Sequence, residues 1–166
     1  MITMKFAILG AGTWGAALAN MLAGLNYDVS VWSPLEEEIK TLNENRTHVH
    51  LKGCKFADSI IFTGDIEKCL KSAEIVIFAT PSVFVRSTAE KIKDIVTKKE
   101  IFISVAKGIE PKTMKTMSEI IEDVLGDVKT VALSGPTHAE EVAIGLPTLI
   151  VSASKDEEVA NFVRDA

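Results

Sequence analysis

The chain has 166 residues, of which 47% are apolar and 25% charged, values that are ordinary for a globular protein with a sizeable core. The net charge of −5 argues against a nucleic-acid partner, because domains that bind nucleic acid usually present a basic face. No apolar stretch is long enough for a membrane span, and the two cysteines, Cys54 and Cys69, have no metal-like spacing. These features favour a reduced, cytoplasmic protein without a metal site.

Strands and helices are predicted to alternate from one end of the chain to the other. The expected strands are apolar runs at residues 4–10, 28–33, 59–64, 74–81, 100–108, 130–136 and 146–154. The expected helices follow them at residues 14–25, 34–45, 65–73, 82–98, 111–125, 137–145 and 155–166. Residues 46–58, with three cations and two histidines, predict a loop.

This order predicts βαβ units. The expected fold is α/β, a Rossmann-like doubly wound, mostly parallel sheet with helices on both faces. Residues 1–166 would form one NAD(P)-binding domain. The last helix is predicted to begin just before the chain stops, which favours a domain that belongs to a longer protein.

The segment GAGTWG at residues 10–15 matches the pattern GxGxxG between an expected strand and an expected helix, the setting in which this motif binds dinucleotides. Gly10 permits the tight turn, Gly12 lets a pyrophosphate approach the backbone, and Gly15 lets the helix pack closely on the strand. The start of the helix adds free amide donors and the positive end of its dipole. We therefore expect a bound dinucleotide; a glycine-rich turn without a ligand is the alternative.

The acid that usually ends the second strand and holds the ribose of NAD is missing, because VSVWSP ends in Ser33 and Pro34. Its absence admits NADP, yet no arginine stands there to bind a 2′-phosphate. The cations that could do so lie in the next loop and are Arg46, Lys52 and Lys55. The choice between NAD and NADP stays open.

Three segments together resemble the NAD(P)-dependent glycerol-3-phosphate dehydrogenases of bacterial type. They are GAGTWGAALA at residues 10–19, AKG at 106–108 and SGPTHAEEVAIGLPT at 134–148. The resemblance covers essentially the whole chain. It implies reversible hydride transfer between NAD(P)H and dihydroxyacetone phosphate, giving sn-glycerol 3-phosphate for phospholipid precursor synthesis. It also implies a second, all-helical domain, absent from this chain, that carries another catalytic lysine; a homodimer is considered for the full-length enzyme.

The resemblance assigns roles to individual residues, and it implies cofactor contacts by Thr13, Trp14, Ser33, Pro34, Lys107 and Ala139. The glycine motif adds Gly10, Gly12 and Gly15, and Pro81 is added by its place at the end of an expected strand. The implied substrate residues are Lys107, Gly135 and Thr137, with Lys107 also catalytic. Many relatives have arginine or histidine where this chain has Pro34, and this departure weakens the case for NADP.

Lys107 has a predicted role on physical grounds as well. Ligands of parallel α/β sheets bind at the carboxyl ends of the strands, and Thr80, Pro81, Lys107 and residues 134–137 all lie at the carboxyl ends of expected strands. An ammonium group there can polarise a carbonyl oxygen and stabilise the alkoxide that forms as hydride arrives. The alternative is a solvated surface lysine.

Three other residues or pairs admit more than one role. His48 and His50 would share a face of an extended segment, but no further metal ligands converge on them in the sequence. His138 opens a short helix beside the expected substrate site, where a structural or capping role is favoured over proton transfer. Phe84 either lines the nicotinamide side of the site or fills the core.

Two rival functions remain. One is another NAD(P)-dependent dehydrogenase of related fold, acting on a hydroxy acid or a hydroxyacyl-CoA. The other is a non-catalytic dinucleotide-binding module, against which the segments AKG and SGPTHAEE argue, because a sensor needs no lysine at the hydride site. A methyltransferase is disfavoured, because the second strand lacks the acid that would hold the ribose of adenosylmethionine.

Overall fold

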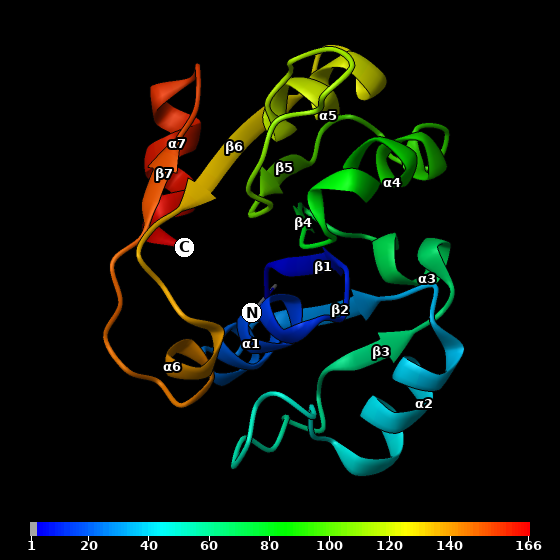
Figure 1. Ribbon diagram of the computed structural model, residues 1–166, viewed down its shortest axis with the longest axis vertical. Coiled ribbons are helices and arrows are strands. Elements are labelled where there is room, and N and C mark those ends of the chain that lie inside the picture. Colours follow the sequence, from blue (N-terminus) through cyan, green and yellow to red (C-terminus); the bar gives the residue numbers. More distant parts are fainter. Residues whose placement is uncertain (1–2) are drawn as a thin grey trace.

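The computed structural model describes residues 3–166 and contains one seven-stranded sheet with the strand order β3-β2-β1-β4-β5-β6-β7 (Figure 1). All neighbouring strands pair in parallel except β6 and β7, which are antiparallel. The strands are β1 Lys5–Leu9, β2 Asp28–Trp32, β3 Ile61–Thr63, β4 Ile75–Phe78, β5 Ile101–Ser104, β6 Lys129–Ser134 and β7 Val151–Ala153. The predicted mostly parallel sheet is confirmed.

Seven α-helices are found within residues 3–166. They are α1 Thr13–Gly24, α2 Glu36–Asn45, α3 Ile66–Leu70, α4 Val85–Ile92, α5 Met117–Leu125, α6 Ala139–Ala143 and α7 Glu157–Asp165. Asp65 begins α3 as predicted, since its carboxylate accepts hydrogen bonds from the amides of Glu67 and Lys68 at 3.0 and 3.1 Å. No helix in this part of the chain has the length and apolar character that crossing a membrane requires.

The helices cover both faces of the sheet, as the doubly wound fold predicts (Figure 1). In β1, Phe6 and Ile8 join a core that includes residues of α1, α2, α6 and α7. The alternate residues Ala7 and Leu9 join a second core with residues of α3, α4 and α5. Because both faces of the central strands are buried, these strands are continuous apolar runs rather than alternating ones.

Several predicted helices are shorter than expected, and the largest differences are in the segments 82–98 and 111–125. The segment 82–98 forms a 3-10 turn, Ser82–Phe84, and then α4, which ends at Ile92. Residues 93–95 form a turn after α4, and Lys98 has φ +66°, a left-handed conformation, so the helix does not extend to residue 98 as predicted. The segment 111–125 becomes helical only at Met117, because Thr116 and Glu119 form a capping box there. The residues before it form a turn, closed by an antiparallel bridge between Ile109 and Thr116.

The strand order creates a topological switch point between β1 and β4. From β1 the chain passes outward to β2 and β3, and then returns to β4 on the other side of β1. The loops that follow β1 and β4 therefore leave the sheet in opposite directions. Ligands of open α/β sheets bind in the crevice that this divergence creates at the carboxyl ends of the strands.

Candidate functional site: two adjoining cavities at the carboxyl end of the sheet

Close contacts within the protein require glycine at two of the three glycine positions in the turn after β1. Gly10 has φ +122°, and a Cβ there would lie 2.7 Å from the carbonyl carbon of Ala79. A Cβ on Gly15 would lie 2.0 Å from the carbonyl oxygen of Gly10. The first turn of α1 therefore lies directly on the turn, as the sequence predicts, and neither site has room for a side chain.

Gly12 differs from its two neighbours in the motif. A Cβ at this position would meet no atom of the protein within 4 Å, so nothing in the fold of residues 3–166 requires glycine there. Gly12 is the N-cap of α1 and has no side chain that could bind the free amides of the first turn. The Gly12 carbonyl accepts the first intrahelical hydrogen bond, from the Ala16 amide at 2.9 Å. The first turn of α1 thus offers backbone amides to a ligand.

A cavity of about 600 Å³ opens beside this turn, and we call it the glycine-turn cavity. It lies at the carboxyl ends of β1, β2, β4 and β5, at the switch point. The residues that line it are Gly10, Ala11, Gly12, Thr13, Trp14, Trp32, Ser33, Pro34, Leu35, Glu38, Ala79, Thr80, Pro81, Phe84, Ser87, Thr88, Lys91, Val105 and Ala106. Seven of the ten predicted cofactor residues are in this lining.

The lining of the glycine-turn cavity suits a dinucleotide. Thr80 is 92% buried, and its Oγ1 has no hydrogen-bond partner within residues 3–166, which leaves a polar atom for a ligand to satisfy. Trp14 and Trp32 add aromatic surface. Phe84 is 56% exposed, so it lines the cavity and does not fill the core. Concave sites with apolar walls and a few unpaired polar groups are typical of cofactor binding.

A second cavity of about 560 Å³ contains Lys107, and we call it the Lys107 cavity. The Lys107 ammonium lies 3.5 Å from the carbonyl oxygen of Gly135. The residues that line this cavity are Thr13, Trp14, Val49, His50, Lys52, Val105, Lys107, Leu133, Ser134, Gly135, Thr137, His138, Ala139 and Glu140. All three predicted substrate residues are therefore brought together here, and His138 lies with them.

The two cavities adjoin at the start of α1, because Thr13, Trp14 and Val105 line both. Of the residues predicted to contact the cofactor, Lys107 and Ala139 line the Lys107 cavity and not the glycine-turn cavity. Gly15 lines neither cavity and instead packs against Gly10.

A close backbone contact leaves no room for a side chain at Gly135. A Cβ there would lie 2.3 Å from the carbonyl oxygen of Leu149, because the segment before β7 crosses it closely. This contact is a second explanation for the glycine, beside the substrate contact that the sequence predicts.

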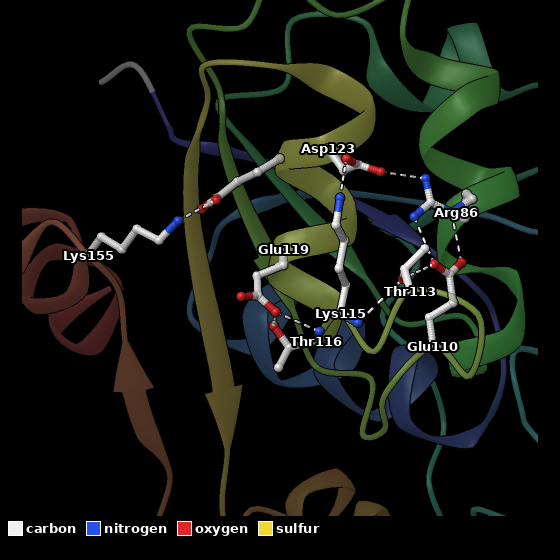
Figure 2. Close-up of polar contacts among 9 residues, drawn as sticks. Arg86, Glu110, Thr113, Lys115, Thr116, Glu119, Asp123 and Lys155 are labelled. Atoms are coloured by element: carbon white, nitrogen blue, oxygen red, sulfur yellow. Dashed lines mark hydrogen bonds and ion pairs between the residues drawn. The ribbon is translucent and has the colours of Figure 1, made fainter.

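The segment that carries Lys107 is held by an ion-pair network (Figure 2). Arg86 of α4 donates two hydrogen bonds to the Glu110 carboxylate, at 2.7 and 2.8 Å, and a third to Asp123 at 2.8 Å. Glu110 also accepts from Thr113, and Asp123 from Lys115. These contacts lower the pKa of Glu110 to about 2, with the Arg86 hydrogen bond as the largest cause. The turn after Lys107 is thereby fixed to both α4 and α5.

The cations expected to bind a 2′-phosphate do not line the glycine-turn cavity. Arg46 donates to the carbonyl oxygens of Ile60 and Asp58 at 3.0 and 2.5 Å and lies over the Phe62 ring. Lys52 lines the Lys107 cavity. The cation that does line the glycine-turn cavity is Lys91 of α4, which sequence reasoning did not single out.

Sequence reasoning also missed Glu38. It is the last of three acids in the first turn of α2, where carboxylates complement the helix dipole whether or not they bind a ligand. Ser33 Oγ donates a hydrogen bond to Glu38 Oε2 at 2.5 Å, so the carboxylate is held at the end of β2. A spacing rule could have found it, since an acid about 20 residues after the glycine motif is the usual ribose ligand.

The two histidines of the loop come together without a further metal ligand. The ring centroids of His48 and His50 are 5.6 Å apart. Within residues 3–166 no group of three histidine, cysteine, aspartate or glutamate side chains is placed to hold a metal ion.

Comparisons with known proteins point to one family. Residues 5–160 match the family described as NAD-dependent glycerol-3-phosphate dehydrogenase N-terminus. A glycerol-3-phosphate dehydrogenase [NAD(P)+] of Lactobacillus delbrueckii is 47% identical over 97% of this chain and 50% of its own length. That of Agathobacter rectalis is 42% identical over 97% of this chain and 48% of its own length.

A solved structure gives the same result. The crystal structure of the glycerol-3-phosphate dehydrogenase from Coxiella burnetii superimposes with a TM-score of 0.92 at 26% identity. It matches 98% of this chain and 50% of the Coxiella chain. This chain thus spans about half the length of the relatives it matches. On this evidence the chain belongs to the family of NAD-dependent glycerol-3-phosphate dehydrogenases, and it corresponds to their N-terminal part.

Proposed function

We propose that this chain is the cofactor-binding domain of a glycerol-3-phosphate dehydrogenase, with residues 1–166 as one domain. The reaction is reversible hydride transfer between NAD(P)H and dihydroxyacetone phosphate, giving sn-glycerol 3-phosphate for phospholipid precursors. The observation that carries the proposal is the adjoining pair of cavities, which share Thr13 and Trp14. One contains the glycine motif and the other a lysine, so a cofactor and a carbonyl substrate can meet at the start of α1.

The glycine-turn cavity is the proposed dinucleotide site. The first-turn amides of α1 would bind the pyrophosphate next to Gly12, and Ser33 and Pro34 would face the adenosine ribose. When bound, NAD(P)H supplies the hydride. Thr80 offers an unpaired hydroxyl, and Pro81 and Phe84 supply apolar walls on the β4 side of the cavity.

Lys107 is the proposed catalytic residue. Negative charge builds on the carbonyl oxygen of dihydroxyacetone phosphate as hydride arrives, and a nearby ammonium stabilises that charge more in the transition state than in the ground state. Gly135 and Thr137 are the proposed substrate contacts, and Ala139 extends the cofactor surface. The cavity also contains Lys52, a second cation suited to an anionic substrate.

The rest of the active site is proposed to come from a second, helical domain, with the whole enzyme cytoplasmic and able to form a homodimer. The test is to measure NAD(P)H oxidation by the full-length product of the gene with dihydroxyacetone phosphate, a 2-keto acid and acetoacetyl-CoA. We expect turnover with dihydroxyacetone phosphate only. Comparable rates with a keto acid would favour another dehydrogenase, and dinucleotide binding without any turnover would favour a non-catalytic module.

The 166-residue chain alone should show little or no turnover. Positioning and acid–base groups each contribute several orders of magnitude to rate, and this chain carries only part of the proposed set. Robust turnover by the chain alone would contradict the proposed division of the active site between two domains.

A further inference from the structure

An acidic side chain, that of Glu38, lies at the end of β2, although the residues that follow this strand in the sequence, Ser33 and Pro34, are not acidic. Ser33 is 2% exposed, and its hydroxyl oxygen both donates to Glu38 Oε2 at 2.5 Å and accepts from the Leu35 amide at 3.2 Å. The Glu38 side chain is half-buried and lines the glycine-turn cavity beside Ser33. The first turn of α2 therefore supplies a carboxylate at the position where the ribose-binding acid of this fold usually stands.

The Glu38 carboxylate forms no ion pair with a cation among residues 3–166. Glu36 and Glu37 precede it in the same helical turn and add negative charge. Lys91 lines the same cavity but belongs to α4, whose buried residues pack on the opposite face of the sheet from those of α2.

One further titratable group influences this carboxylate electrostatically. His48 interacts with Glu38, and burial lowers the pKa of its imidazole below the ordinary value, against the raising effect of Glu38. At pH 8 the His48 ring is therefore uncharged and leaves the negative charge of Glu38 uncompensated. Binding experiments on the cavity are best done at this pH.

We propose that Glu38 makes the glycine-turn cavity select NAD(H) over NADP(H). The inference rests on the proposed cofactor site and deepens it, since the relatives are named for both NAD+ and NADP+ and leave the choice open. A carboxylate accepts hydrogen bonds from ribose hydroxyls. It repels a 2′-phosphate, which carries between one and two negative charges and would have to enter a partly desolvated site.

The test is calorimetric titration of the 166-residue chain with NADH and NADPH at pH 8 and low salt. We expect NADH to bind at least about tenfold more tightly than NADPH, which corresponds to about 1.4 kcal/mol. Glu38→Gln should bring the two affinities within about threefold of each other, chiefly by strengthening NADPH binding. In the wild-type chain the preference should also shrink as salt is raised, because screening weakens charge repulsion.

Two further variants make the test specific. Glu37→Gln removes the same charge from the same turn, but Glu37 is exposed and does not line the cavity, so the preference should persist. Lys91→Ala should change the two affinities by the same factor. A loss of NADPH binding alone in Lys91→Ala, or an unchanged preference in Glu38→Gln, would overturn the role of Glu38. Failure of the wild-type chain to bind either dinucleotide would overturn the cofactor site and this inference together.

Discussion

The carbonyl oxygen of Gly10 lies only 2.0 Å from the position that a Cβ on Gly15 would occupy. The turn after β1 and the first turn of α1 are therefore packed backbone against backbone. This contact explains the third glycine of the motif without any ligand. It also distinguishes Gly15 from Gly12, where an added Cβ would meet no atom within 4 Å beyond its chain neighbours and which lines the glycine-turn cavity.

Gly15→Ala should destabilise the fold. The clash is with backbone, which cannot move aside as a flexible side chain can, so we expect a loss of at least about 2 kcal/mol despite the better helix propensity of alanine. Gly24→Ala is the matched control in the same helix, because a Cβ there meets nothing within 4 Å. It should leave stability unchanged or raise it by up to about 1 kcal/mol. Urea denaturation of both variants checks this, and equal stabilities would contradict the packing described here.

Lys107→Met in the full-length enzyme should impair chemistry much more than folding. Loss of one electrostatic donor to a developing oxyanion typically costs about 10²–10³ in rate, or roughly 3–4 kcal/mol. The apolar stem of the side chain is kept, and Lys107 is exposed, so the free energy of unfolding should change by less than about 1 kcal/mol. The measurements are kcat/KM for dihydroxyacetone phosphate and thermal melts.

Lys107→Arg distinguishes a compact ammonium from positive charge in general. A planar guanidinium has a different donor geometry, so this variant should restore activity only in part. Near-wild-type catalysis by Lys107→Met would remove the proposed role. A collapsed melting temperature with a parallel loss of activity would instead make Lys107 a structural residue.

The order of elements could be predicted from the sequence because both faces of the sheet are buried, which gives continuous apolar runs for the strands. The limits of two helices could not be found from periodicity alone. Residues 111–116, PKTMKT, are part of the predicted helix, but the bridge between Ile109 and Thr116 is a longer-range pairing that periodicity does not show. The capping box at Thr116 and Glu119 was present in the sequence as TMSE, and it marks the true start of α5.

Glu110→Gln should lower stability at neutral pH and have less effect in acid. Hydrogen bonds from Arg86 and then Thr113 lower the pKa of Glu110 to about 2 in the folded protein, against an ordinary value of about 4.3. A lowered carboxyl pKa stabilises the fold above the unfolded-state pKa, and this contribution is lost as pH falls through the folded-state pKa. The difference between wild type and variant should therefore shrink between about pH 4.5 and pH 2.

Chemical denaturation of both proteins across this pH range measures the effect. Glu44→Gln is the control, since it makes the same change of charge at an exposed position of α2. Its stability should stay close to that of the wild type throughout. A constant difference between wild type and Glu110→Gln from pH 7 to pH 2 would show that the ion pair in Figure 2 does not carry the stabilisation.

The residues of the two cavities could largely be predicted, because they follow strand ends in the sequence and parallel strands end at one edge of the sheet. Glu38 could not be placed in this way. It lies in the first turn of α2, and a hydrogen bond from Ser33 Oγ holds its carboxylate at the end of β2. The prediction that loop cations bind a 2′-phosphate was also not met by the position of Arg46. Its hydrogen bonds to the carbonyl oxygens of Ile60 and Asp58 depend on a loop conformation that no spacing rule specifies.

The central claim is that a dinucleotide binds against the backbone at Gly12, and the most direct measurement is NADH binding by the 166-residue chain and by Gly12→Val. Both tryptophans of the chain, Trp14 and Trp32, line the cavity, so energy transfer from them to bound NADH reports occupancy alongside calorimetry. Gly12→Val should melt within a few degrees of the wild type, since a Cβ at this position meets no atom within 4 Å beyond its chain neighbours, and the helix cap is weakened by about 1 kcal/mol. Its affinity for NADH should fall by more than about tenfold, at least about 1.4 kcal/mol. Unchanged NADH affinity in a folded Gly12→Val protein would contradict the placement of the cofactor at the glycine turn.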